Sequence, residues 1–163
     1  MAFIYQPYRE RSFLARTVNT IITRRPERAL NGWLKMESVP TREMLGYRAL
    51  LDLWQFITQE LGQAPVVVES TEFRYEPRRV LEKYCAAVGI PFDPGMLTWK
   101  QQAHRTWDPE LMQQEQYAKW QQILNQSTRI LPEDPELPPI PPEHRRLPED
   151  AYKVYDALRA HAL

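Results

Sequence analysis

The chain has 163 residues, of which 43% are hydrophobic and 26% charged, and its 21 basic and 21 acidic side chains give a formal net charge of zero. This length suits a single domain, residues 1–163, and the charge balance argues against a general nucleic-acid-binding protein, which normally carries a basic excess. No apolar run approaches the roughly 20 residues that span a bilayer, and the first residues show no secretory signal. We therefore expect a cytoplasmic protein that does not insert into a membrane.

Two short segments rich in β-branched residues predict strands. The first is VNTIIT at 18–23, and the second is PVVVES at 65–70, whose continuous apolar run is typical of a strand buried on both faces. Pro26 predicts the first turn of a helix that runs to about Met36, because the first helical position tolerates proline. A strand is thus followed directly by two arginines and a helix.

A second helix is predicted from Arg42 to Leu61, with Thr41 as its N-cap and Gly62 as its C-terminal stop. Its apolar residues recur at helical spacing and form one stripe: Leu50, Leu53, Trp54, Ile57 and Leu61. After the second strand a turn leads to a helix that Pro77 opens and Gly89 closes.

Asp108 and Pro109 predict a further helix that extends to about Gln126. Residues 131–148 hold seven of the fifteen prolines and are predicted to form an extended, polyproline-like arm. A closing helix, residues 149–163, follows from a start at Pro148. The order of elements favours a predominantly helical α/β fold with a small parallel sheet.

The segment VVVESTEFRYEPRRVLEKYCAAVGIPF, residues 66–92, resembles the sulfotransferase family and its bacterial relatives, with a strand, a proline-started helix and a Val-Gly-Ile-Pro-Phe close. The stretch ITRRPERAL, residues 22–30, is similar to the family's strand–Arg–helix element. The resemblance covers the C-terminal part of the family only. It implies a truncated P-loop fold, and it implies that Arg24, with Arg25 beside it, holds the 3′-phosphate of the sulfuryl donor PAPS. The alternative is that Arg24, Arg25 and Arg28 simply solvate a helix start and pair with Glu27 or Asp52.

The family's phosphate-binding loop is not found in this sequence. There is no Gly-x-Ser/Thr-Gly-Thr pattern, no histidine precedes His104, and Gly32 stands where the family has a serine. We therefore expect that this chain binds PAPS only if another chain supplies the missing half. A truncated sheet would expose a strand edge, which we expect a second copy, a partner chain or the N-terminal segment MAFIYQPY to cover.

Other residues could carry acid–base chemistry or bind a substrate. Glu69 ends a buried strand, and His104 precedes a predicted helix near Asp108, so both are candidate catalytic residues. Their alternative roles are a hydrogen bond to the next turn for Glu69 and an exposed loop position for His104. A pocket for a small apolar molecule is predicted from four tryptophans: Trp33, Trp54, Trp99 and Trp107. The single cysteine, Cys85, and the scattered histidines predict no metal site.

Three functions remain open from the sequence. The first is a truncated sulfotransferase-like protein that cannot transfer a sulfuryl group alone and acts through a retained small-molecule pocket or a partner chain. The second is a repurposed enzyme of secondary metabolism, of the cyclase or isomerase type, that uses Glu69 or His104. The third is one half of a split PAPS-dependent sulfotransferase.

Overall fold

The structure is a computed structural model that describes residues 10–35, 38–101, 125–133 and 136–163. Its elements are, in chain order, α1 (Arg11–Leu14), β1 (Thr20–Thr23), α2 (Pro26–Leu34), α3 (Arg42–Leu45), α4 (Tyr47–Gln55), the π-helix η2 (Phe56–Glu60), β2 (Val66–Glu69), α5 (Ser70–Tyr75), α6 (Pro77–Val88), the 3₁₀ helices η3 (Pro94–Leu97) and η4 (Pro142–His144), and α9 (Arg146–Arg159). Within the described residues, no helix is both long and apolar enough to cross a membrane.

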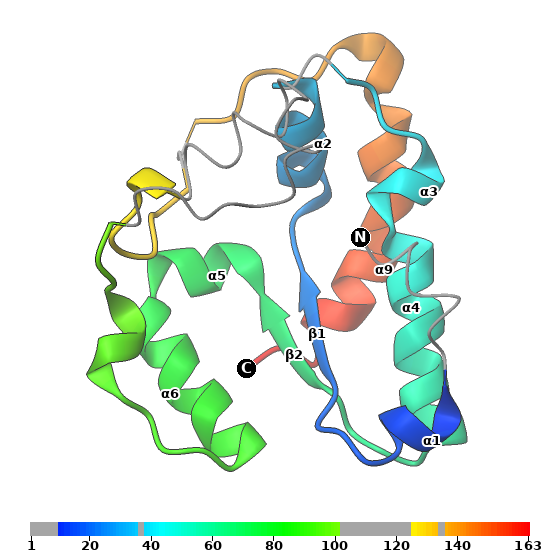
Figure 1. Ribbon diagram of the computed structural model, residues 1–163. Helices are drawn as coiled ribbons and strands as arrows, with labels where there is room; N and C mark the ends of the chain where they lie inside the picture. Colours follow the sequence, from blue (N-terminus) through cyan, green and yellow to red (C-terminus); the bar gives the residue numbers. More distant parts are fainter. Residues whose placement is uncertain (1–9, 36–37, 102–124, 134–135) are drawn as a thin grey trace, which may run out of the picture.

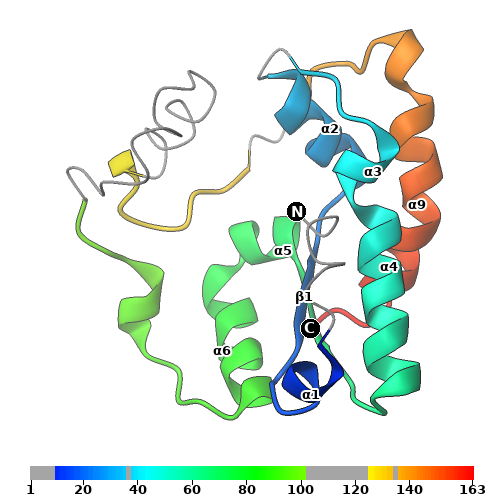
Figure 2. The ribbon, with the colours of Figure 1, turned by 45° about the vertical axis from the view of Figure 1, so that its right-hand side comes forward.

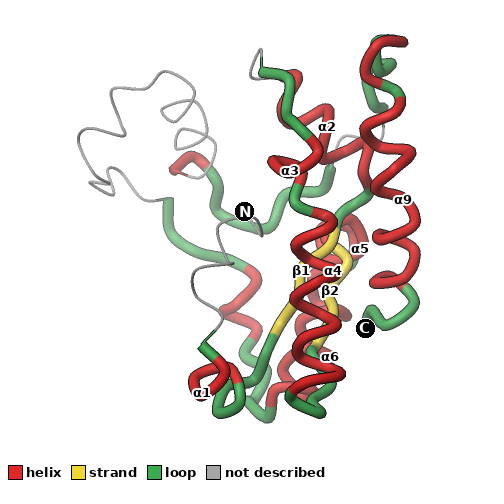
Figure 3. The backbone as a smooth tube through the Cα atoms, turned by 90° about the vertical axis from the view of Figure 1, so that its right-hand side faces the viewer, coloured by secondary structure: helices red, strands yellow, loops and turns green. Residues whose placement is uncertain are grey.

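The sheet consists of the two predicted strands, and they are parallel. β1 pairs with β2 so that Thr20 lies opposite Val66 and Thr23 lies opposite Glu69. The other edge of β2 is extended by the C-terminus, because Val67 forms a bridge with Ala162 and accepts a hydrogen bond from the backbone N–H of Leu163 at 3.1 Å. Figure 3 shows the two strands at the centre of the molecule with helices around them.

Helices cover both sides of this small sheet. α5 and α6 lie on one side, and α4 and α9 lie on the other (Figures 1 and 2). α2 continues from the carboxyl end of β1 and packs against α9. The predicted class, a mostly helical α/β fold with a small parallel sheet, is therefore confirmed.

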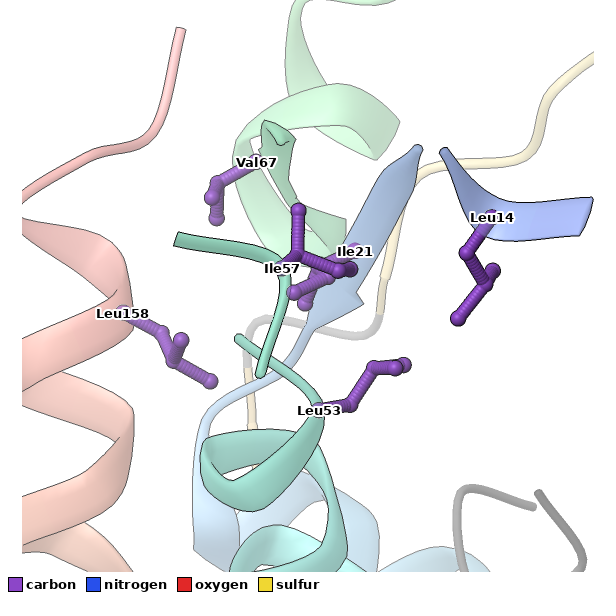
Figure 4. Packing of buried hydrophobic residues seen from close by; sticks show 6 residues of the cluster. All are labelled: Leu14, Ile21, Leu53, Ile57, Val67 and Leu158. Atoms are coloured by element: carbon purple, nitrogen blue, oxygen red, sulfur yellow. The ribbon is translucent and has the colours of Figure 1, made fainter. Parts of the chain in front are cut away.

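The main apolar core lies between the strands and the helices α4 and α9. It contains six buried side chains, each less than 10% exposed: Leu14, Ile21, Leu53, Ile57, Val67 and Leu158. Figure 4 shows Leu158 reaching from α9 toward Ile57 and Ile21. The predicted apolar stripe is confirmed, because Leu50, Trp54 and Leu61 pack against the same cluster.

The single helix predicted over 42–61 is wrong in detail. Gly46 adopts a left-handed conformation, with φ at 78°, and separates α3 from α4. The last turn winds as the π-helix η2, where the Thr58 hydroxyl donates to the carbonyl of Trp54 at 2.8 Å and competes with the backbone N–H groups. The predicted cap is present, since Thr41 accepts a hydrogen bond from the Met44 N–H at 3.2 Å.

Two further boundaries differ from the prediction. The turn expected after β2 is the helix α5, which forms because Glu69 caps its first turn. The closing helix begins at Arg146 and so starts two residues before Pro148, which its first turn accommodates, and the arm itself contains η4. The helix predicted from Pro109 lies outside the described residues except at its end.

Candidate functional site: an arginine cluster around Glu133

Three arginines from three places in the fold converge on one carboxylate. Arg24 directly follows β1, Arg28 lies one turn into α2, and Arg74 lies on α5. Their guanidinium nitrogens lie 2.5, 3.0 and 3.6 Å, respectively, from carboxylate oxygens of Glu133. The Thr71 hydroxyl of α5 donates to the same carboxylate at 3.4 Å. The carboxyl ends of two parallel strands lead into this cluster, which is where open α/β sheets place ligand sites.

The cluster is partly buried, and this strengthens its electrostatic interactions. The side chain of Glu133 is only 2% exposed and that of Arg28 is 8% exposed, whereas Arg24 and Arg74 are about one-third exposed. Removing a carboxylate from water costs several kcal/mol unless charges and hydrogen bonds replace the water. Three guanidinium groups and a hydroxyl supply that replacement. The two more exposed arginines still face solvent and can meet a second anion.

A cavity of about 190 Å³ adjoins the cluster. Its charged lining consists of four basic side chains and one carboxylate: Arg24, Arg28, Lys35, Arg74 and Glu133. Asn31 also lines it and is 5% exposed, and its side-chain nitrogen, like Nε of Arg24, has no hydrogen-bond partner within the described parts of the chain. Buried donors without partners are uncommon in folded proteins. The cavity therefore has both the charge and the free donors that an oxyanion needs.

Gly32 lies on the same wall of the cavity. A Cβ atom placed on this residue would lie 3.9 Å from a terminal nitrogen of Arg24, which is an ordinary van der Waals distance. The Cβ atom of a serine, the residue that the family has at this position, would therefore fit without displacing Arg24. The glycine leaves room in the cavity and removes one potential hydrogen-bond donor.

Arg25 has a different environment from Arg24. It is exposed and hydrogen-bonds to Tyr152 of α9, an interaction that raises the pKa of Arg25 above its ordinary value. It does not line the cavity of about 190 Å³. The structure therefore separates the two neighbouring arginines, although the sequence suggested one shared anion site. The role of Arg25 in cofactor binding stays a prediction.

Glu69, the first candidate catalytic residue, is 3% exposed and caps α5 by accepting a hydrogen bond from the Glu72 N–H at 2.8 Å. This is the hydrogen bond to the following turn that the sequence left as its alternative role. Burial, with the nearby Glu69 charge adding to it, raises the pKa of Tyr155 to about 12. An acid–base role for Glu69 stays a prediction, and His104, the second candidate, lies outside the described residues.

The three described tryptophans of the predicted pocket lie in different parts of the fold. Trp33 lies in α2, Trp54 stacks on His161 at 5.0 Å between ring centroids, and Trp99 donates from its indole nitrogen to the Ser127 carbonyl at 2.9 Å. Trp107 lies outside the described residues. None of the three described tryptophans lines the arginine cavity or a second cavity, of about 360 Å³, between α3, α4 and α9. That second cavity is lined mainly by apolar side chains, including Leu45, Leu51 and Val154.

Sequence reasoning did not find Glu133 or Arg74 as site residues. Glu133 lies in the proline-rich arm, and Arg74 lies in a stretch predicted to be a turn, so no local pattern linked either residue to Arg24. The available signal was weaker: a short acidic stretch, with Glu133, Asp134 and Glu136, in the proline-rich arm. In the described part of the chain, no three His, Cys, Asp or Glu residues form a group that could hold a metal ion.

Comparison with known proteins gives the chain its family. It is 25% identical over 151 residues to branched-chain-amino-acid aminotransferase-like protein 1 of Arabidopsis thaliana, an alignment that covers 91% of this chain and 25% of that protein. The chain thus spans about a quarter of the length of this curated relative. No solved structure matches the chain. The model of a sulfotransferase domain matches residues 21–162, and the chain therefore belongs to the sulfotransferase domain family.

Proposed function

We propose that this sulfotransferase-like chain binds a phosphate-bearing nucleotide of the sulfuryl-donor class at Arg24. The observation that carries the proposal is the cavity of about 190 Å³ with four basic side chains at the carboxyl end of β1. Guanidinium groups form charge-assisted, often bidentate hydrogen bonds to phosphate oxygens. Arg24 and Arg74 are exposed enough to reach a ligand, and Asn31 supplies an additional donor from the wall.

We further propose that the chain does not transfer a sulfuryl group unaided. Transfer requires preorganised donors around the moving group, and its 163 residues contain only five glycines, none of them close enough in sequence to form a phosphate-binding loop. The residues around Arg24 fit one phosphate group of PAPS. They include no second cradle for the 5′-phosphosulfate among the described residues that line the cavity.

Isothermal titration calorimetry with adenosine 3′,5′-bisphosphate, the desulfated donor product, tests the proposal. We expect saturable binding by the wild-type chain and a loss of roughly 10- to 100-fold in affinity for Arg24→Met, because one charge-assisted hydrogen-bonding group is removed. Gly32→Ser should bind at least as tightly as wild type, since its hydroxyl adds a donor and its Cβ atom lies at an ordinary van der Waals distance from Arg24.

Arg78→Met is the matched control. Arg78 is an exposed arginine of α6 that pairs with Glu82 and does not line the cavity, so its loss should leave the affinity unchanged. Adenosine without phosphates should not bind. Equal affinities for the Arg24 and Arg78 variants, or no binding to any form, would contradict the proposal.

A second proposal concerns a partner chain, and the exposed side chains around β1 favour it. Ile22 of β1 and Val18 just before it are each 62% exposed, and Phe13 is 53% exposed. We propose that a second copy or a partner chain, one able to supply the missing phosphate loop, covers this side of the sheet. Sedimentation equilibrium should show self-association that Ile22→Lys abolishes, while a monomer at high concentration would remove the homodimer form of this proposal.

A further inference from the structure

Glu133 already occupies the position where the proposed ligand would meet the arginines. Its carboxylate is almost completely buried and contacts the same guanidinium groups, on Arg24, Arg28 and Arg74, that line the cavity. A carboxylate and a phosphate both offer anionic oxygens in a geometry that matches the guanidinium fork. The two anions therefore compete for the nitrogen atoms of Arg24.

One carboxylate does not neutralise this cluster. Among the described residues, four basic side chains line the cavity, and Glu133 is the one acidic residue on its lining. A phosphate group carries a charge of nearly −2 at neutral pH and offers more acceptor oxygens than a carboxylate. A phosphate ligand can therefore outcompete Glu133 for the arginines, even though Glu133 is tethered close to them.

Polar contacts hold the segment that carries Glu133 to the body of the protein. Arg74 donates to the Leu131 carbonyl at 2.7 Å, and the Tyr75 hydroxyl donates to the Glu133 carbonyl at 3.2 Å. Further back, the Trp99 N–H donates to the Thr128 carbonyl at 2.9 Å. Figure 2 shows this segment, in yellow to orange, passing above α5 toward α2.

Apolar burial contributes less here than in the core, because Leu131 is 38% exposed and Ile130 is only partly buried. Segments with few buried apolar contacts open at low free-energy cost compared with the core. The polar contacts, above all those of the Glu133 carboxylate, therefore decide whether the segment stays in place. Arg74 contributes twice, to the carboxylate and to the Leu131 carbonyl, so a ligand that draws Arg74 away loosens both contacts.

We infer that Glu133 is an internal competing anion that keeps the arginine site closed until a phosphate ligand displaces it. This inference rests on the proposed function and names the regulation of the same site. Displacement releases residues 127–133 from α5 and from Trp99. The affinity of the wild-type chain for the ligand is lowered by the fraction of molecules in which Glu133 holds the arginines.

Calorimetry with adenosine 3′,5′-bisphosphate on wild type, Glu133→Gln and Glu143→Gln tests the inference. Glutamine keeps the size of the side chain and removes its charge, so Glu133→Gln should bind about 10-fold or more tightly than wild type. Glu143 lies exposed in the same proline-rich stretch, within η4, and its variant should match wild type. Circular dichroism establishes that each variant is folded.

Hydrogen exchange of the wild-type chain supplies a readout that needs no variant. Saturating ligand should increase amide exchange in the peptide that covers residues 127–133 and at Trp99, because their contacts to α5 and to each other are released. A structural role for Glu133 alone would not produce faster exchange on ligand binding.

The outcomes separate the two proposals. No binding by wild type and by Glu133→Gln overturns the proposed function and the inference with it. Binding of equal or greater strength by wild type, with exchange at 127–133 unchanged or slowed, leaves the proposed function in place and overturns the inference alone. Tighter binding by Glu133→Gln together with faster exchange in liganded wild type supports both.

Discussion

The apolar core and the arginine cluster lie along the same two strands but follow different physical rules. In the core, the side chains of Ile21 and Val67 are each 1% exposed and pack against α4 and α9. Further along, at Thr23 of β1 and in the following helix α2, the buried groups include polar ones, and several of them, including Thr23 Oγ1 and Asn31 Nδ2, meet no hydrogen-bond partner within the described residues. The apolar core therefore stabilises the fold.

The second region carries the features of a site for a ligand. Buried donors and acceptors without partners lower the free energy of unfolding, and a ligand that hydrogen-bonds to them would remove this cost. The comparison shows that the apolar core and the charged groups lie at different points along the strands. The amino-terminal and middle parts of β1 and β2 contribute to the core, and their carboxyl ends lead to the charged groups.

Deleting a core side chain should have the largest effect. Leu158 is 1% exposed and reaches the centre of the main cluster, so Leu158→Ala should lower the free energy of unfolding by about 2–5 kcal/mol through lost burial and a residual cavity. The same substitution at Leu131, which is 38% exposed, should cost well under half as much. Urea denaturation measures both, and similar losses would show that the core is not where the stability resides.

Removing an unpartnered polar group from the other region should raise stability. Thr23 is 1% exposed and its hydroxyl has no partner among the described residues, so Thr23→Val should raise the free energy of unfolding by about 1–2 kcal/mol. Thr20 of the same strand is the control, because it is exposed and its hydroxyl lies 3.2 Å from that of Tyr84. A destabilised Thr23→Val variant would mean that this hydroxyl is satisfied.

Alkaline pH should lower the free energy of unfolding, because Tyr47 and Tyr155 are buried and keep their protons more tightly in the folded chain. Burial raises the pKa of Tyr155 from 10.0 to about 12, and it also raises that of Tyr47. Above pH 10 the unfolded chain loses the Tyr155 proton while the folded chain retains it, so the free energy of unfolding falls by about 1 kcal/mol between pH 9 and pH 11. Urea denaturation of Tyr155→Phe should show a shallower fall over the same range, and an identical slope would refute the assignment.

The smallest effect should come from an ion pair outside both regions. Arg42 and Asp150 lie 2.5 Å apart, but their side chains are 63% and 51% exposed. Exposed pairs contribute about 0–1 kcal/mol, and salt screens them, so Arg42→Ala should change the urea midpoint only slightly. Changing the buried Arg28 to methionine should lower stability more, because the Glu133 carboxylate then loses a close partner. Equal losses of stability for Arg28→Met and Arg42→Ala would show that a buried charge contributes no more than an exposed one in this chain.

The sequence by itself determined the local elements and the position of one arginine of the cluster around Glu133. The β-branched runs predicted β1 and β2, Pro26 and Pro77 predicted the starts of α2 and α6, and the stripe through Leu53 and Ile57 predicted the face that meets the core. These features depend on backbone sterics, missing N–H groups and periodicity, which act over a few residues. For the same reason the sequence also predicted that Arg24 directly follows a strand.

Only the tertiary structure decided which charges meet. Arg24 pairs with Glu133 from a distant proline-rich arm, whereas its neighbour Arg25 hydrogen-bonds to Tyr152 of α9. Such pairings depend on how the arm and α9 fold back over the ends of the strands, and no local propensity encodes that path. A buried carboxylate needs the nearest available cations, and the packing of the whole chain determines which cations are nearest.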